Sequence, residues 1–267
     1  MASKPKVLII TGYGLSCEAE SQAAWEMAGA QVQAMHLHDL LAAPAQLLQY
    51  QALMLIGGAS FGDQLGAGQV LAGRLRGRLQ SELHAFIAQG HLLLGIDNGF
   101  LVMLKLGLLP GLDGQYSKPR LSALLNDSAT FQTRWVRVGF ENTPCVFTRG
   151  LPPMDLPIGH AEGKLFTPDK KLLERLETEG AVACRYLDPL TDEPANSFPH
   201  NPRVSLNVIA GLCDPSGPIC VLLPDPEAYL FPESHPQWTR QKISGNLPTE
   251  GWGLQIFRKA VAHLRAL

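Results

Sequence analysis

The turn Gly95-Ile96-Asp97-Asn98-Gly99 places one acidic side chain at the tip of a sharp bend between a strand and a helix. Small residues flank this tip, an arrangement typical of a nucleophile elbow, which projects its tip side chain into an active site. In most enzymes built this way the tip is Ser or Cys, whereas this chain carries Asp97. We therefore ask whether the site still performs covalent chemistry.

Buried strands and the loops that follow them position this turn. Strand-like and helix-like segments alternate, with strands expected at 6–11, 31–37, 51–58 and 91–96, and helices at 16–29, 68–90 and 99–107. The alternation predicts a parallel sheet with helices on both faces, joined by right-handed crossovers. Chemistry in such sheets sits at the carboxyl ends of the strands. The loops at 12–17, 57–63 and 95–99 leave those ends, so we expect them to converge.

The second half of the chain is richer in strand patterns. We expect strands at 131–140, 180–187, 206–214 and 218–225, a long loop at 189–205, and an amphipathic helix at 249–267. The segment HPQWTR at 235–240 is expected to be extended on the surface, either as a covering loop or as a contact for a partner. Since we find no repeat and no interdomain linker, we expect residues 1–267 to form a single domain.

Composition excludes several classes of protein. A net charge of −2 with 17% charged residues gives no strong attraction to nucleic acid or to anionic membranes. No apolar run approaches the roughly 20 residues that a membrane span needs, and the N-terminus lacks the pattern of a signal peptide. We therefore expect a cytoplasmic protein with neither nucleic acid nor membrane as a partner. The five cysteines form no C-x-x-C pair, so we expect free, mostly buried thiols.

Eight short motifs occur in an order that is typical of one family. They are GYGLSCEAE, GGASFGDQLGAG, GIDNGF, FQTRWV, IGHAEGKL, RYLDP, NPRVSLNVIAGL and LLPDPEAY, and the resemblance runs from about residue 6 to residue 260. Together they resemble the glutaminase subunit of phosphoribosylformylglycinamidine synthase, a class I glutamine amidotransferase of purine biosynthesis. The resemblance implies an α/β protein with the three-layer class I glutamine amidotransferase-like (flavodoxin-like) fold, a mostly parallel central sheet covered by helices on both faces.

The resemblance also implies where the chemistry would take place. In that family the elbow reads G-I-C-N-G-F, and its Cys attacks the side-chain amide of glutamine. A His in a later P-H-P-E motif acts as the base, and the Glu two residues further on orients it. The ammonia released then travels to a synthetase partner. In this chain the nucleophile position is Asp97, the base position is Asp225, and the orienting Glu is kept as Glu227.

A substrate pocket is implied around these positions. Its residues would be Gly57, Gly58, Ser60, Phe61, Gly62 and Asp63 in a Gly-rich loop that supplies an oxyanion N–H, Asn98, Gly99 and Phe100 at the elbow, and His160 and Glu162. An equal alternative for the last two is a loop that only shapes a turn. Four further positions depart from the family: Gly66 replaces an Arg, Leu101 replaces a Gln, and N-P-N-G-S becomes N-P-R-V-S at 201–205.

Two carboxyl groups are poor replacements for a thiolate and an imidazole. Amide hydrolysis by the family route needs a strong nucleophile and a base that returns its proton. Asp97 is a weak nucleophile toward an amide, and Asp225 would need a pKa well above about 3.9 to take the His role. Losing one triad member typically costs several orders of magnitude in rate. We predict a chain without glutaminase activity or cofactor, acting as a partner or scaffold subunit of the synthetase.

Other interpretations of the acidic residues stay open. Asp97 could be the carboxylate nucleophile of a repurposed hydrolase, with His160 or His200 activating water. Asp97, Asp225 and Glu227 could instead hold a proton or bind a cation such as Mg²⁺ or Ca²⁺, and the former glutamine pocket could keep another small ligand. A relaxed, solvated pocket is the simplest interpretation, and we predict no resident metal.

Overall fold

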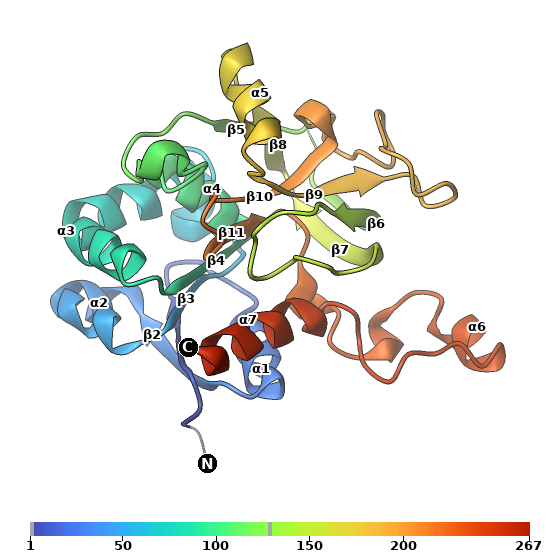
Figure 1. Ribbon diagram of the computed structural model, residues 1–267, viewed down its shortest axis with the longest axis horizontal. Coiled ribbons are helices and arrows are strands. Elements are labelled where there is room, and N and C mark those ends of the chain that lie inside the picture. Colours follow the sequence, from blue (N-terminus) through green and yellow to red (C-terminus); the bar gives the residue numbers. More distant parts are fainter. Residues whose placement is uncertain (1–2, 128–129) are drawn as a thin grey trace.

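The computed structural model describes residues 3–127 and 130–267, in which a sheet of nine strands lies between layers of helices (Figure 1). The strands of this sheet are β1 (Lys6–Thr11), β2 (Gln31–His36), β3 (Ala52–Leu55), β4 (Leu92–Ile96), β6 (Gln132–Phe140), β7 (Met154–His160), β9 (Val182–Leu187), β10 (Ile209–Cys213) and β11 (Ile219–Leu222). Their order is β2-β1-β3-β4-β11-β10-β9-β6-β7. A separate two-stranded sheet pairs β5 (Ser122–Leu125) with β8 (Glu162–Phe166).

The half of the sheet that carries the loops of interest is parallel, as predicted. Strand β1 pairs in parallel with β2 and β3, and β4 pairs in parallel with β3 and β11. Strands β10, β9, β6 and β7 then extend the sheet by antiparallel pairing. The carboxyl ends of β1, β3, β4 and β11 therefore share one edge, which is where parallel sheets place their chemistry.

Helices cover both faces of the sheet. They are α1 (Glu18–Ala28), α2 (Leu37–Ala42), α3 (Gln69–Ala88), α4 (Asn98–Leu106), α5 (Lys170–Thr178), α6 (Trp238–Ile243) and α7 (Leu254–Ala266). Leu8 and Ile10 of β1 belong to the core shared with α2, α3 and α4, whereas Val7 and Ile9 belong to the core shared with α1 and α7. Adjacent residues of one strand thus face opposite cores. The expected three-layer architecture is confirmed (Figure 1).

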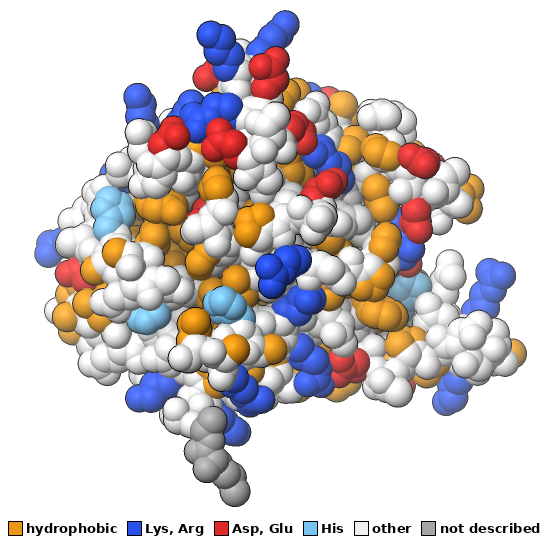
Figure 2. All heavy atoms as spheres, in the orientation of Figure 1, with side chains coloured by type: hydrophobic (Ala, Val, Ile, Leu, Met, Phe, Trp, Pro, Cys, Tyr) orange, Lys and Arg blue, Asp and Glu red, His pale blue; other side chains and the backbone are white. Residues whose placement is uncertain are grey.

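Several segments differ from the sequence predictions, which also contained no element at β5, β7, β8 or α5. Helix α2 was not predicted, and it begins directly after β2, where the His36 imidazole accepts a hydrogen bond from the His38 N–H at 3.2 Å. The segment 235–240, expected to be extended, contains the start of α6. Figure 1 shows α6 at the end of an arm that projects from the body, and Figure 2 shows basic side chains at the tip of that arm. The residues of α6 are not buried. The sequence therefore shows no periodic apolar face that would predict this helix.

Two further expectations concern thiols and membranes. All five cysteines are free, and four of them are buried, as predicted. Within residues 3–127 and 130–267, no helix combines the length and the apolar character that crossing a bilayer requires. On the face shown in Figure 2, acidic and basic side chains are interspersed.

Glycines at the elbow allow α4 to approach the sheet closely. A Cβ atom added to Gly99 would lie 2.0 Å from the carbonyl oxygen of Leu55 in β3. One added to Gly95 would lie 2.6 Å from the Met103 sulfur and 2.8 Å from the Gly99 carbonyl oxygen. The start of α4 therefore packs backbone against backbone on β3, and this contact fixes where the elbow tip points.

We expect Gly99→Ala to destabilise the fold, because the added methyl group meets backbone that cannot rotate away. Overpacking of this kind costs about 1–3 kcal/mol, measured as the free energy of unfolding in urea. Gly73→Ala is the matched control, because an added Cβ in this interior turn of α3 has no atom within 4 Å. That change should stabilise by about 0.5–1 kcal/mol. Equal effects of the two substitutions would contradict the close-packed elbow.

Candidate active site at the elbow

Asp97 has the backbone of a nucleophile elbow. It joins β4 to α4 with φ 49° and ψ −108°, a conformation that residues other than glycine rarely adopt. Its N–H donates to the Leu222 carbonyl oxygen of β11 at 3.1 Å, which anchors the turn on the neighbouring strand. The sequence prediction of a strained turn with an acidic tip is confirmed in its geometry.

The Asp97 carboxylate accepts a hydrogen bond from the backbone N–H that is expected to stabilise the oxyanion. The Gly58 N–H donates to Asp97 Oδ2 at 3.0 Å. Gly57 gives the carboxylate room, since a Cβ there would lie 3.0 Å from the same oxygen. In an oxyanion hole such an N–H must remain available for the oxygen of the substrate. Here a side chain of the protein satisfies it.

Two further acid–base side chains, His160 and Asp225, lie close to Asp97. His160, at the carboxyl end of β7 and 4% exposed, places Nδ1 3.2 Å from Asp97 Oδ1. One donor atom from each of Asp97, His160 and Asp225 lies within 4.8 Å of the others. Glu227 is 1% exposed, and neither of its carboxylate oxygens has a hydrogen-bond partner among the described residues. The predicted convergence of Asp97 and Asp225 is therefore found, with Glu227 buried in the same neighbourhood.

A buried arginine beside the carboxyl groups was missed by the sequence analysis. Arg203 is 0% exposed, and none of its three guanidinium nitrogens has a hydrogen-bond partner in the described part of the chain. It packs against β8, where a Cβ added to Gly163 would lie 2.5 Å from Arg203 Nη1. The positive charge of Arg203 lowers the pKa of both Asp97 and Asp225. The available signal was the change from N-P-N-G-S to N-P-R-V-S.

The loop around Arg203 keeps a shape suited to glycine. Val204 occupies the Gly position of the family motif and has φ 53°, which is strained for a β-branched residue. Asn201 closes this loop, because its Oδ1 accepts from the Ser205 N–H at 3.1 Å and its Nδ2 donates to the Ser205 carbonyl oxygen at 3.3 Å. Both residues are buried. They therefore hold Arg203 in place rather than bind a ligand.

Burial sets the proton affinities of this cluster. It raises the pKa of Asp97 to about 6, against the opposing effects of the Gly58 N–H and the Arg203 charge. Burial, followed by the charges of Glu227 and Asp97, raises the pKa of Asp225 well above its usual value. Burial and the Asp97 charge raise the pKa of Glu227 to about 8. Burial lowers the pKa of Arg203 to about 9, so Arg203 is charged at pH 7. Near neutral pH Glu227 therefore retains its proton, whereas Asp97 is largely ionised.

Asn98 and Glu162 fix the loops around the tip. Ser60 Oγ donates to Asn98 Oδ1 at 2.7 Å, and Asn98 Nδ2 donates to Asp63 Oδ1 at 3.2 Å. Asp63 also accepts from the Gly68 N–H at 3.1 Å, and Glu162 Oε1 accepts from the Ala67 N–H at 3.0 Å. These bonds tie the loop after β3 to the elbow and to β8. Asn98 and Glu162 thus act on the backbone that shapes the site.

A cavity of about 660 Å³ opens over this cluster. The predicted residues that line it are Gly58, Asp63, Asp97, Asn98, His160, Glu162 and Asp225. The predicted residues outside its lining are Gly57, Ser60, Phe61, Gly62, Gly99, Phe100 and Glu227. Phe100 is fully buried in the core. Cys17 also lines the cavity, and burial together with the Glu227 charge raises the pKa of its thiol to about 12, so it is not a thiolate nucleophile at neutral pH.

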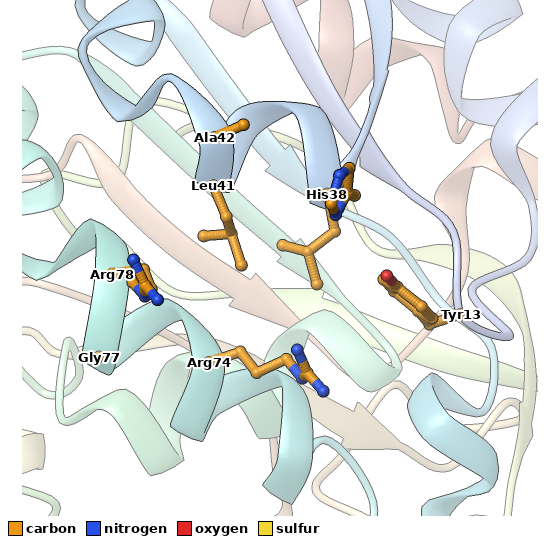
Figure 3. Close-up of a pocket in the computed structure, with 8 residues that line it drawn as sticks. Tyr13, His38, Leu41, Ala42, Arg74, Gly77 and Arg78 are labelled. Carbon is orange, nitrogen blue, oxygen red and sulfur yellow. The ribbon is translucent and has the colours of Figure 1, made fainter.

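Phe61, predicted to bind substrate, instead packs on two residues that line a second groove, Tyr13 and Arg74. Its ring stacks on Tyr13 with centroids 4.5 Å apart, and the Arg74 guanidinium lies 5.1 Å from its centroid. This groove of about 430 Å³ lies between α2 and α3, and Figure 3 shows Arg74 reaching from α3 toward Tyr13. Its charged side chains are exposed. The buried acid–base groups lie at the elbow cavity, so we place the candidate site there.

Comparison with known proteins shows the family to which the chain belongs. Residues 4–264 match the model of the CobB/CobQ-like glutamine amidotransferase domain. The chain is 37% identical to the phosphoribosylformylglycinamidine synthase subunit PurQ of Methanococcus maripaludis, over 97% of this chain and 98% of that protein. Identity to the subunit PurQ of Dehalococcoides mccartyi is also 37%, over 98% of this chain and 99% of that protein.

Solved structures give the same result for the fold. A chain from the structure of PurLQS from Thermotoga maritima superposes with a TM-score of 0.67 at 25% identity, covering 98% of this chain and 99% of that chain. A glutamine amidotransferase from Thermotoga maritima superposes with a TM-score of 0.52 at 12% identity, covering 99% of both chains. The second likeness concerns the fold alone. The expected class I glutamine amidotransferase-like fold is therefore confirmed.

Glu227→Gln should flatten the dependence of stability on pH. The folded chain keeps a proton on Glu227 up to a pKa of about 8, against 4.5 for an unperturbed carboxyl. Between these values folding takes up a proton, so stability falls as pH rises. We expect the variant to gain thermal stability over the wild type at pH 8 and little at pH 5, measured in EDTA. Exposed Glu233→Gln is the control. Parallel profiles for Glu227→Gln and the wild type would contradict a protonated Glu227.

Proposed function

Because the chain belongs to the CobB/CobQ-like glutamine amidotransferase family and is homologous to PurQ subunits, we propose that it is a partner subunit of a phosphoribosylformylglycinamidine synthase without glutaminase activity of its own. One observation carries the proposal. The elbow tip is a carboxylate that accepts the Gly58 N–H at 3.0 Å. The same side chain therefore replaces the nucleophile and takes the donor that would stabilise the oxyanion.

The proton-transfer half of the mechanism is also missing. Burial and the charges of Glu227 and Asp97 raise the pKa of Asp225 well above its usual value, and this carboxyl group stands where the family uses an imidazole as its base. Glu227 stands where a carboxylate would orient an imidazole, yet its two oxygens have no hydrogen-bond partner among the described residues. A buried acceptor left unpaired needs an explanation. Loss of the histidine that it would orient supplies one.

The cavity is poorly suited to an amino acid such as glutamine. It is lined by the carboxyl groups of Asp63, Asp97, Glu162 and Asp225, and its lining among the described residues includes no Lys or Arg. The α-carboxylate of glutamine would therefore find no cationic side chain in this lining to pair with. Gly66, which stands where the family carries an Arg, is consistent with this loss.

A repurposed hydrolase is the weaker alternative. It needs a base to activate water against an ester at Asp97. His200 lies 4.0 Å from Asp188 and is not part of the cavity lining in the described chain. His160 is in reach of Asp97, but its Nδ1 is directed at the nucleophile oxygen itself. The family membership gives this alternative no support.

The partner role draws on the relatives and on one exposed surface. The similar structure from Thermotoga maritima is that of PurLQS. In this chain Ile243 on the projecting α6 arm is 89% exposed. The arm projects from the body, which leaves this side chain accessible to a partner (Figure 1). We propose that the chain docks on a PurL-type synthetase and that the arm takes part.

We expect the purified chain to release no ammonia from glutamine above the buffer rate. Two variants should gain measurable glutaminase activity, because the elbow backbone is intact. One is the double variant Asp97→Cys with Asp225→His, and the other is the triple variant that adds Arg203→Asn. The triple variant should be faster, since Arg203 no longer places a buried charge beside the new pair. Ammonia is measured with a coupled dehydrogenase assay, and Asp97→Cys alone is the control. Rapid ammonia release by the wild type would contradict the proposal.

Mixed with the synthetase of its own organism, the chain should elute as a complex in gel filtration. Ile243→Glu should weaken this complex by at least about tenfold in Kd, because burying a charge at an interface is costly. Leu190→Glu is the matched control, since Leu190 is 92% exposed on a different loop. A wild-type chain that elutes alone would rule out the partner role, and equal effects of both variants would rule out the arm.

A further inference from the structure

We propose that Asp97, His160 and Asp225 form a binding site for a divalent transition-metal ion such as Zn²⁺ or Mn²⁺. Donor atoms from the three side chains lie within 4.8 Å of one another at the floor of the elbow cavity. Two carboxylates and one imidazole are a common donor set for such ions. This inference goes beyond the partner role and concerns the isolated chain, so it does not depend on docking.

The spacing of two donors already suits a metal ion. Asp97 Oδ1 and His160 Nδ1 are 3.2 Å apart. Two ligands at bond lengths of about 2.0–2.1 Å around a tetrahedral ion would be roughly 3.3 Å apart. Because the third donor atom lies within 4.8 Å of both, a side-chain rotation of Asp225 would bring it into range.

Hydrogen bonds turn the donors toward a common point. The Gly58 N–H holds Asp97 Oδ2, which leaves Oδ1 directed at the imidazole. The Gly159 N–H donates to His160 Nδ1 at 3.3 Å, so Nδ1 is unprotonated and uses its lone pair in this bond, which a metal ion on Nδ1 would replace. A lone pair facing a carboxylate oxygen is repulsive unless a proton or a cation lies between them. Bonds that orient ligands from outside the coordination sphere are typical of metal sites.

Two buried groups beside the three donors lack hydrogen-bond partners among the described residues. His160 is 4% exposed, and its Nε2 has no hydrogen-bond partner in the described residues. Glu227 is 1% exposed, and its carboxylate oxygens also lack a hydrogen-bond partner among the described residues. Its negative charge raises the pKa of the neighbouring Asp225. With all three carboxyl groups ionised, Arg203 balances one negative charge and two remain. One divalent cation would neutralise them without added protons.

The imidazole decides which cations fit. Mg²⁺ and Ca²⁺ prefer sites built from oxygen ligands, whereas Zn²⁺ and Mn²⁺ accept nitrogen as well. The all-carboxylate site for Mg²⁺ or Ca²⁺ considered from the sequence is therefore revised, because His160 rather than Glu227 completes the cluster. Water from the cavity would fill the remaining coordination positions.

The test is calorimetric titration of the EDTA-treated full chain with ZnCl₂, MnCl₂ and MgCl₂ at pH 7. We expect one Zn²⁺ or Mn²⁺ site per chain and Mg²⁺ binding at least about tenfold weaker. His160→Gln and Asp225→Asn should each weaken Zn²⁺ binding by about 10–100-fold. His38→Gln is the control, because His38 is an exposed histidine in the groove of Figure 3. No site in the wild type, or equal affinity in His160→Gln, would overturn the proposal.

A second measurement uses only the wild type, so it tests the metal site even if the variants fail to fold. The Co²⁺-loaded chain should show d–d absorption without a thiolate-to-cobalt band, because the proposed ligands are oxygen and nitrogen. A thiolate band would place the ion on a cysteine such as Cys17 and overturn the assignment. The glutaminase assay is independent of both measurements. A chain that binds no metal and releases no ammonia would refute this inference alone, whereas metal binding together with rapid ammonia release would refute only the proposed function.

Discussion

The hydrogen bond from the Gly58 N–H to Asp97 Oδ2 is the interaction on which the rest of the site depends. It joins the loop after β3 to the strained tip after β4 over 3.0 Å. The close packing of Gly99 on Leu55 and the anchor on β11 hold the tip so that this bond can form. The bond keeps the loops in the arrangement of an active site while using up its oxyanion donor. Under the proposed function, this one contact keeps the shape of the site and removes its glutaminase chemistry.

Buried charge is the second constraint. Four titratable side chains lie in or beneath the elbow cavity, and apolar cores surround it on both faces of the sheet. These side chains are Asp97, Asp225, Glu227 and Arg203. Isolated buried charges are costly unless they are paired, protonated or bound to a cation. The raised pKa values of the carboxyl groups and the lowered pKa of Arg203 are the expression of that cost. A ligand that relieves it would bind at the elbow.

Much of this arrangement could be predicted from local sequence, and the exceptions have physical causes. Apolar runs and the small residues around Asp97 specify strands and a turn through local interactions, so the parallel half of the sheet and the elbow were predictable. Arg203 was not, because its burial results from packing against Gly163, which is distant in sequence. Phe61 and Phe100 were assigned to the pocket because motif position does not give side-chain direction. Helix α6 lacks a buried face, so no apolar periodicity marked it.

The central claim is that the chain does not hydrolyse glutamine. Glutamine hydrolysis by the chain in complex with its synthetase tests this claim most directly, because an inactive site is most readily activated when the partner is bound. Ammonia released from glutamine labelled with ¹⁵N at the side-chain amide would be followed by NMR, with unlabelled ammonium supplied to confirm that the synthetase turns over. The account predicts product nitrogen drawn only from the ammonium. Transfer of ¹⁵N from glutamine into the amidine product would contradict it.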